Sequence, residues 1–314
     1  MQLSPNAINT FVDCGKRYDL KYNKGIYHNI NSLTFLLGHI AEAMVQFSME
    51  ATLLEDPITH KQSWAKAVVA CWDKLPPMTS DLQGHFVAWI NAVLQGQPDM
   101  DELTIALNKG FREADLHGFV YKPRVKINNG KSNTLLTNAL LEVLDCVGAF
   151  LDRKDYKTFI ASVESLDTQV QLGLEVPNWG SSGPVTLKGY ADFIFMLPNN
   201  RLVCLDAKYS SFDLESYNIN RDTQLFCYAA ALKKAYPDHA IEVGYMALRD
   251  NPKIIMCDME ELLSPVTSSR IGQAVKAIKH GIFMPSCGGG GYQSINKMCD
   301  YKNDCSFASC SKTK

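Results

Sequence analysis

The stretch GYADFIFMLPNNRLVCLDAKYSS, residues 189–211, has Arg201 next to its turn and places three further charged side chains in two runs that otherwise have the pattern of buried strands. Asp192 lies in the first run, and Asp206 and Lys208 lie in the second, after a turn at 198–200. An unpaired charge in a protein core is costly, so three charges in one hairpin indicate either an exposed hairpin or a functional site. Asp206 and Lys208 are two residues apart and point the same way, because side chains alternate along a strand.

A three-residue loop would bring the two acids face to face. It would pair position 197 with 201, and therefore Asp192 with Asp206, whose Cβ atoms would lie about 5 Å apart. Two carboxylates at that separation repel each other unless a proton or a cation lies between them. Mg²⁺ or Mn²⁺ suits such a place, because both prefer oxygen ligands and retain waters. A two-residue loop would instead pair Asp192 with position 207 and separate the acids.

Two carboxylates, a divalent cation and a lysine are the components of phosphodiester hydrolysis. The cation polarises a phosphoryl oxygen and lowers the pKa of a bound water. Lys208 can orient that water and offset the charge that develops on the phosphoryl oxygens. The alternative is an exposed hairpin on which Lys208 only neutralises Asp206, and the hairpin by itself does not separate the two interpretations.

The spacing of these residues resembles that of the PD-(D/E)xK nuclease superfamily. Asp192, in GYAD, resembles the family's GxxD strand, and LDAK resembles its (D/E)xK strand. In the next helix Gln224 and Tyr228 share one face and resemble the QxxxY motif of the RecB-type exonuclease branch, which includes CRISPR-adaptation and phage iron–sulfur nucleases. The resemblance implies that the two acids and the lysine are catalytic and that Gln224 and Tyr228 contact the substrate. The residues alone also allow a tyrosine packed on the sheet and a solvated glutamine.

The family implies one more metal ligand, a histidine four residues after a glycine on an N-terminal helix, and this sequence differs there. The fourth residue after Gly38 is Glu42, and His39 follows the glycine directly. A carboxylate is a harder ligand than imidazole, so we expect Glu42 rather than His39 at the metal. Glu175, in GLEVP, is expected to have a supporting or purely structural role. The expected ligands of Mg²⁺ or Mn²⁺ are then Glu42, Asp192, Asp206 and the carbonyl of Ala207.

The C-terminal stretch CGGGGYQSINKMCDYKNDCSFASC crowds four of the ten cysteines together. The RecB-type relatives that this chain resembles often carry an iron–sulfur cluster, bound by one N-terminal cysteine and by three C-terminal ones in a C-x2-C-x5-C pattern. By this resemblance Cys14 matches the first ligand, and Cys299 and Cys305 match C-x5-C, whereas the C-x2-C step is absent. Cys287 is the expected fourth ligand and Cys310 its alternate. Four thiolates suit a [4Fe–4S] cluster, with structural zinc or free thiols as the alternatives.

The implied fold class is α/β, with a restriction-endonuclease-like core in which helices flank a mixed central sheet. Residues 1–50 are expected to be N-terminal helices of this core, and 51–165, with apolar residues at helical spacing, a helical insertion. Strand-like alternation begins near residue 168 and indicates a nuclease core over 166–285. Residues 286–314 form the expected Cys-rich iron–sulfur tail.

The composition is that of an ordinary soluble protein: 314 residues, 46% hydrophobic, 20% charged, with a net charge of −2. No apolar run suits a membrane span and no secretory signal is visible, so we expect a cytoplasmic protein of a bacterium or a phage-infected cell, with reduced cysteines. A nearly neutral chain can bind DNA only through a local basic patch. Lys16, Arg17, Lys21 and Lys24 are the candidates for it, although a solvated helix face fits them equally.

The hairpin and the resemblance together predict a Mg²⁺- or Mn²⁺-dependent deoxyribonuclease. We expect an exonuclease that acts on single-stranded or duplex DNA ends in recombination, repair or replication, alongside a helicase, recombinase or single-strand-binding protein. One alternative is a DNA-end-binding or assembly factor that has kept the fold without turnover, which the exchange of the expected histidine for Glu42 would allow. A restriction-type endonuclease is the lesser alternative.

Overall fold

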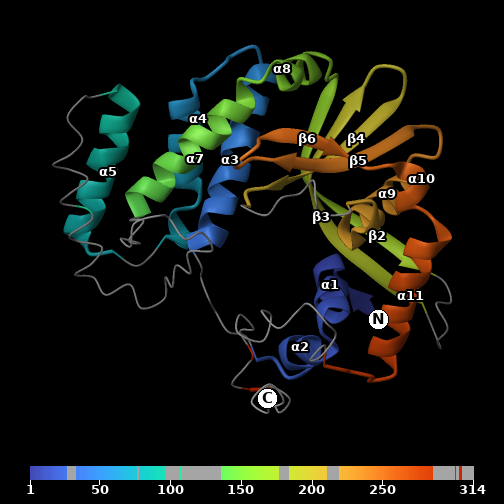
Figure 1. Cartoon of the computed structure of the whole chain (residues 1–314). Coiled ribbons are helices and arrows are strands. Elements are labelled where there is room, and N and C mark those ends of the chain that lie inside the picture. The colour runs from blue at the N-terminus through green and yellow to red at the C-terminus, as the bar shows by residue number, and fades with distance from the viewer. Residues whose placement is uncertain are drawn as a thin grey trace.

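The computed structural model describes most of the chain, and its elements are arranged around one sheet (Figure 1). The described residues are 1–26, 33–75, 78–96, 107, 136–176, 184–210, 219–285, 301 and 304–305. The strands are β1 (Gln2–Leu3), β2 (Ser165–Val176), β3 (Val185–Leu197), β4 (Arg201–Lys208), β5 (Ala240–Ala247) and β6 (Lys253–Met256). The helices between β1 and β2 are α1 (Pro5–Asp13), α2 (Gly15–Tyr18), α3 (Leu33–Leu53), α4 (His60–Ala70), α5 (Ser80–Gln95), α7 (Leu136–Leu151) and α8 (Lys154–Ala161). Those after β4 are α9 (Thr223–Ala235), α10 (Met259–Leu262) and α11 (Pro265–Lys279).

The sheet is mixed, as the expected fold class requires. Its six strands follow the order β1-β3-β4-β5-β6, with β2 paired to β3 off this path. β3 is antiparallel to β2 and β4, whereas β4 and β5 are parallel and are connected through α9. A parallel pair needs such a crossover, and the helix that forms it can cover one face of the sheet. The prediction of an α/β fold with a mixed, helix-flanked sheet is confirmed.

Helices cover both faces of the sheet and build two hydrophobic cores. On one face, α3, α4, α5, α7 and α8 form a core that contains Trp64, Phe86 and Phe150 together with Phe193 and Leu205 of the sheet. On the other face, α1, α9 and α11 pack on the alternate side chains of β3, β4 and β5. Figure 1 shows these two groups on opposite sides of the strands. The helices between residues 51 and 165 therefore share one core with the sheet.

The β3–β4 hairpin has the three-residue loop that aligns the two acids. Leu197 pairs with Arg201, and the loop between them is a turn. Asn199 and Asn200 both have a left-handed backbone, with φ of 63° and 55°. Asparagine tolerates this conformation better than other residues with a side chain, which favours the turn. The register predicted from the loop length is thus the register of the strands.

Within the described part of the chain, no helix combines the length and the apolar character needed to cross a membrane.

Candidate active site

Asp192 lies where β3 lacks a backbone partner on one edge. Because β2 occupies one edge of β3 along its length, β1 and β4 share the other edge. β1 pairs with residues 186–187 and β4 with residues 193–197, so Asp192 falls between them. Its Oδ2 atom accepts a hydrogen bond of 2.9 Å from the backbone N–H of Ala207. The carboxylate takes the place of a ladder partner and is thereby fixed beside β4.

Asp206 is buried in β4, where two side chains from its surroundings bind its carboxylate. It is 1% exposed. The ammonium group of Lys208 forms an ion pair with Oδ2, and Nε2 of Gln224 donates to Oδ1 at 2.7 Å. Lys208 also donates to Oε1 of Gln224 at 3.3 Å and lies 5.3 Å from the ring centroid of Tyr245. The acid, the lysine and the glutamine therefore form a closed ring of contacts.

The first turn of α9 supplies Gln224, and the second supplies Tyr228. Asp222 caps the helix, because its Oδ1 accepts from the backbone N–H groups of Gln224 and Leu225. Nε2 of Gln224 donates to the hydroxyl of Tyr228 at 2.7 Å, and that hydroxyl donates to the carbonyl of Tyr190. Tyr228 is 2% exposed, so in this arrangement it supports Gln224 from within. The expected substrate contacts of both residues stay a prediction.

Gly189, the first residue of GYAD, makes room for the tyrosine ring. A Cβ atom at this position would lie 3.1 Å from Cε1 of Tyr228 and 3.4 Å from Cγ of Pro5. The first distance is shorter than ordinary carbon–carbon contacts of about 3.5–4.0 Å. The glycine of the GxxD pattern is therefore explained by the close packing of β3 against α9 and α1.

Glu42 approaches the same place from α3, on the side opposite α9. Nε2 of Gln169 donates to Oε1 of Glu42 and lies 3.5 Å from Oδ1 of Asp192. His39 contacts Glu42: its Nδ1 lies 4.0 Å from Oε2 of Glu42, and its ring packs edge-on against Phe35. The structure thus connects Glu42 to Asp192 through one side chain. The choice of Glu42 as a metal ligand remains a prediction.

Burial and mutual repulsion oppose ionisation of the three acids. The pKa of Asp192 is raised to about 8, first by burial and then by the charges of Asp206 and Glu42. Burial and the charge of Asp206 likewise raise the pKa of Glu42. Burial raises the pKa of Asp206, and Lys208 acts against this. Burial alone would lower the pKa of Lys208, but Asp206 and Asp192 raise it. A proton or a bound cation, in addition to Lys208, would therefore stabilise this cluster of acids.

The oxygen ligands of these residues suit a hard divalent cation. The carboxylates, however, already form an ion pair or hydrogen bonds with nitrogen atoms of neighbouring side chains. Carboxylate and carbonyl oxygens are the ligands that Mg²⁺ and Mn²⁺ prefer. Across the described ranges, no three His, Cys, Asp or Glu side chains are gathered as a ready metal site. Lys208 instead contacts Asp206, and Gln169 contacts Glu42. A cation would have to displace Lys208 from Asp206 and draw the three acids closer.

Comparison with known proteins identifies the family. The model of the PD-(D/E)XK nuclease superfamily matches residues 2–310. The chain belongs to the PD-(D/E)XK nuclease superfamily. This membership confirms the resemblance and supports nuclease activity in general, in a superfamily whose members generally use divalent metals. No curated protein matches the chain.

Two solved structures are similar to this nuclease chain. The crystal structure of SSO0001 is 16% identical, with a TM-score of 0.32, and the match covers 54% of this chain and 74% of that one. The second is a protein from Eubacterium rectale named "Putative exonuclease", which is 11% identical with a TM-score of 0.33. That match covers 73% of this chain and 77% of the other.

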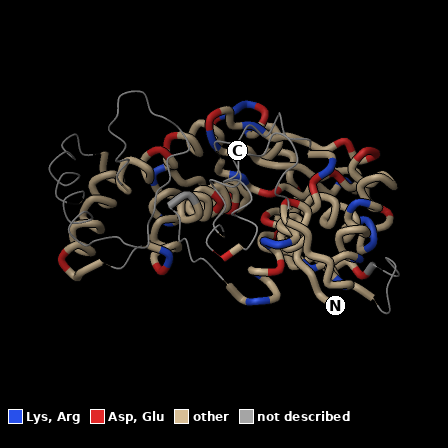
Figure 2. Tube along the Cα trace, turned by 60° about the horizontal axis from the view of Figure 1, so that its bottom comes forward, with Lys and Arg blue, Asp and Glu red and all other residues tan. Residues whose placement is uncertain are grey.

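The other predicted polar residues of this PD-(D/E)XK chain lie away from the acids or are paired. Glu175 is exposed on β2 and pairs with Thr186 of β3, six residues before Asp192. Lys16 and Lys24 form ion pairs with Asp19, at 2.7 and 3.7 Å. In Figure 2 lysines and arginines are interspersed with acidic residues over the described chain. The tracking of phosphates by the predicted basic residues, including Arg17 and Lys21, stays a prediction.

The chain returns to its N-terminal helices after α11. Cys14 immediately precedes α2. A Cβ atom on Gly15 would lie 2.9 Å from the backbone nitrogen and oxygen of Met284. The ring of Phe283 stacks on that of Tyr18, with centroids 5.8 Å apart and planes inclined by 14°. The segment that leads into the Cys-rich tail is therefore packed against the residues that follow Cys14.

Cys305 also lies near these N-terminal helices. Asp19 is the main cause of the raised pKa of Lys16, and the charge of Cys305 contributes to it. This places Cys305 near Lys16, which follows Cys14 by two residues in the sequence. The three remaining candidate ligands, Cys287, Cys299 and Cys310, lie outside the described residues.

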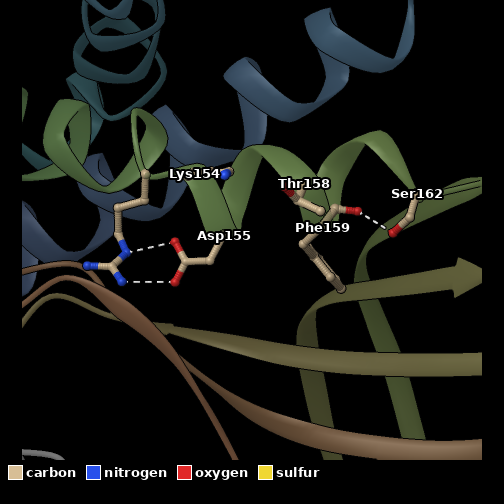
Figure 3. A pocket seen from close by; sticks show the side chains of 6 residues that line it. Lys154, Asp155, Thr158, Phe159 and Ser162 are labelled. Atoms are coloured by element: carbon tan, nitrogen blue, oxygen red, sulfur yellow. Dashed lines mark hydrogen bonds and ion pairs between the residues drawn. The ribbon is translucent and has the colours of Figure 1, made fainter.

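A surface pocket of about 850 Å³ lies along α8 and shares no residue with the acidic cluster (Figure 3). Arg153 and Asp155 form two hydrogen bonds of 2.9 Å in its wall, and Ser162 donates to the carbonyl of Phe159 at 2.6 Å. The arginine and the aspartate neutralise each other. The pocket therefore has no group of acids comparable to the one at β3 and β4.

Gln169 is the residue of the site that the sequence does not predict. No local pattern in TQVQLGLEV distinguishes it from Gln171. It would have been found from the strand pairing, because Thr168 pairs with Phe193 and Val170 with Ala191, which leaves Gln169 opposite Asp192.

Proposed function

We propose that this chain is a metal-dependent DNA exonuclease that hydrolyses phosphodiester bonds with Mg²⁺ or Mn²⁺. The observation that carries the proposal is the convergence of Asp192, Asp206 and Glu42 beside Lys208, in a chain of a nuclease superfamily. The pKa values of the three acids are raised, and a bound cation would favour their ionised forms. The order of the motifs, D…DxK…QxxxY, supports the RecB-type exonuclease branch and DNA ends as the substrate.

The proposed metal ligands are the carboxylates of Glu42, Asp192 and Asp206 and the carbonyl of Ala207. A divalent cation bound by them supplies Lewis acidity at the phosphoryl oxygen and lowers the pKa of a water. Lys208 leaves its ion pair with Asp206, orients the attacking water and offsets the charge that develops on the phosphoryl oxygens.

Gln224 has two roles in the proposed site. Its amide group contacts both Asp206 and Lys208 and so links a proposed metal ligand to the proposed catalytic lysine. On the side away from Tyr228 it contacts the nucleic acid strand, so that substrate and catalytic groups share one anchor. Tyr228 fixes this anchor through its hydrogen bond to the glutamine.

The proposal is tested on end-labelled single-stranded DNA, end-labelled duplex DNA and a closed circle, each with Mg²⁺ or Mn²⁺. Wild type should degrade linear DNA and spare the circle, and Lys208→Ala should degrade neither. Cleavage of the circle would replace the exonuclease with the endonuclease alternative.

A DNA-end-binding or assembly factor is the second candidate, and one observation favours it. Lys208 and Gln169 engage the carboxylates, and among the described side chains no ready metal group is present. This candidate predicts retained binding of DNA ends without cleavage, with either metal, by a protein that contains its full complement of cluster or zinc. Cleavage that requires Lys208 would exclude it.

We further propose that Cys14, Cys287, Cys299 and Cys305 bind a [4Fe–4S] cluster, with Cys310 as the alternate ligand. The packing of Phe283 and Met284 near Cys14, and the position of Cys305, support a tail that returns to the N-terminal helices. Iron, sulfide and zinc analysis after anaerobic purification tests the cluster, and Cys14→Ser should lose the iron. Zinc without iron or sulfide would establish the zinc alternative.

The cytoplasmic location, expected from the sequence, and the helicase, recombinase or single-strand-binding partner, implied by the resemblance, stay predictions.

A further inference from the structure

Gln169 has a left-handed backbone in the interior of a strand. Its φ is 52°, although the neighbouring residues of β2 keep their pairing: Thr168 with Phe193 and Val170 with Ala191. A residue with a side chain seldom has positive φ within a strand, and such outliers cluster at functional sites.

This backbone conformation changes the direction of the side chain. Consecutive residues of a strand normally point to opposite faces. Thr168 and Gln169 nevertheless both contact α3: Oγ1 of Thr168 accepts from Gln46 at 3.3 Å, and Nε2 of Gln169 donates to Glu42. Gln46 and Glu42 are one helical turn apart. The left-handed residue thus allows the amide to reach Glu42.

The amide of Gln169 joins two acids that would otherwise repel. Its Nε2 donates to Glu42 and lies 3.5 Å from Oδ1 of Asp192. A primary amide has two N–H donors and no charge, so it can serve two carboxylates without neutralising either. The second oxygen of each acid has another neighbour. Oε2 of Glu42 lies near His39, and Oδ2 of Asp192 accepts a hydrogen bond from the backbone N–H of Ala207.

We propose that Gln169 is a positioning residue that holds Glu42 and Asp192 beside each other, so that a divalent cation can bind both. Its amide would keep Oε1 of Glu42 engaged when a cation is bound and would leave Oε2 available as a ligand. The inference rests on the proposed metal-dependent function, but it concerns metal affinity rather than DNA cleavage. Loss of comparable outer contacts to metal ligands weakens metal binding about 10–100-fold.

The test is Mn²⁺ binding to the full-length protein by calorimetry and electron paramagnetic resonance. Gln169→Gly removes the amide and tolerates the left-handed backbone. Gln171→Gly is the matched control, because this glutamine lies on the same strand and donates to the hydroxyl of Tyr190 at 3.2 Å instead of to an acid. Asp192→Asn defines the binding that belongs to the site. If Gln169→Gly does not fold, Gln169→Asn replaces it, because asparagine accepts the backbone but is too short to span both acids.

We expect Gln169→Gly to weaken the Asp192-dependent binding about 10–100-fold and Gln171→Gly to change it less than about twofold. In a Glu42→Ala background the loss caused by Gln169→Gly should shrink to about threefold or less, because its main partner is absent. A merely structural role would give the same loss in both backgrounds. Saturating Mn²⁺ should restore most of the DNA cleavage rate of Gln169→Gly.

The proposal is overturned by wild-type Mn²⁺ affinity in a folded Gln169 variant, by equal losses in the two backgrounds, or by a wild type that shows no Asp192-dependent Mn²⁺ binding. Its failure is distinct from that of the proposed function. A wild type that binds Mn²⁺ through Gln169 but cleaves no DNA would refute the nuclease proposal alone. A wild type that cleaves DNA, beside a Gln169→Gly variant with unchanged Mn²⁺ affinity, would refute this inference alone.

Discussion

Asp192 carries a carboxyl group where burial and two neighbouring acids oppose its charge. Its pKa is raised from 3.8 to about 8, so the native state holds this proton more tightly than the unfolded chain does. Stability from such a group is fully present below about pH 4 and is lost as the pH rises towards about 8. Without metal, the unfolding free energy should therefore decrease across this range.

Asp192→Asn should remove much of that loss. In the absence of metal we expect the variant to be more stable than wild type at pH 8, by on the order of 1 kcal/mol or more. Saturating Mg²⁺ should stabilise only the wild type, because a ligand of the native state raises its unfolding free energy. Denaturant unfolding with EDTA and with Mg²⁺ at several pH values measures both effects. A wild type that gains stability over the variant between pH 5 and pH 8 without metal would contradict the account.

Gln224 should matter to the reaction more than to folding. Gln224→Met keeps the length of the side chain but loses the donors to Asp206 and Tyr228 and the acceptor for Lys208. We expect DNA hydrolysis to slow by about 10²-fold or more, as when one donor to the reacting charge is removed. Gln273→Met, on the exposed face of α11, is the control. Steady-state kinetics would contradict the role if both variants retain the wild-type rate.

At the residue scale, the sequence predicts the acids and the lysine but not the glutamine that joins two acids. Asp192, Asp206 and Lys208 follow from strand alternation and a loop of three residues, both of which are local. Gln169 depends on how β2 pairs with β3 across the long connection at 177–183, and local pattern does not fix that register. The left-handed backbone has no signal in the sequence either.

At the scale of elements, the site depends on how closely α9 packs on β3. Gly189→Ala would place a Cβ atom 3.1 Å from the ring of Tyr228. We expect a loss of unfolding free energy of about 1–3 kcal/mol, typical of overpacking, together with slower DNA hydrolysis. Gly173→Ala is the matched control on β2, the strand paired with β3, because a Cβ atom at Gly173 would meet no atom within 4 Å. Equal melting temperatures for the two variants would show that the close packing is unimportant.

The starts of two helices can be predicted from the sequence, as the β3–β4 hairpin can. Ser4 followed by Pro5 predicts the start of α1, and in the structure the Ser4 side chain accepts from the N–H of Ala7. The same pair, Ser264 and Pro265, begins α11. β1 has only two residues, and its place beside β3 depends on tertiary packing, which explains why no periodic pattern reveals it.

At the scale of the whole molecule, the helices between residues 51 and 165 and the sheet depend on one core. Trp64 is fully buried there and donates to the carbonyl of Leu140, and Glu142 of α7 pairs with Arg249 after β5 at 2.7 Å. The change of periodicity in the sequence marks this helical segment but does not show which face of the sheet it covers. That depends on contacts between residues far apart in the chain.

A shared core predicts one cooperative unfolding transition. In a Trp179→Phe variant the remaining tryptophans are Trp64, Trp72 and Trp89, so fluorescence reports on the helical segment alone. Far-UV circular dichroism reports on the whole chain. We expect the two denaturation curves to coincide, as they do for a two-state protein. Separate midpoints would mean that the helices fold independently of the sheet.

The most direct test of the nuclease site is hydrolysis of linear DNA by wild type, Lys208→Met and Lys233→Met with Mg²⁺ or Mn²⁺. Lys233 is an exposed lysine on α9 and controls for the loss of one positive charge. We expect wild type and Lys233→Met to degrade the DNA and Lys208→Met to be slower by at least about 10²-fold. Undiminished hydrolysis by a folded Lys208→Met protein would contradict the assignment of the active site to this hairpin.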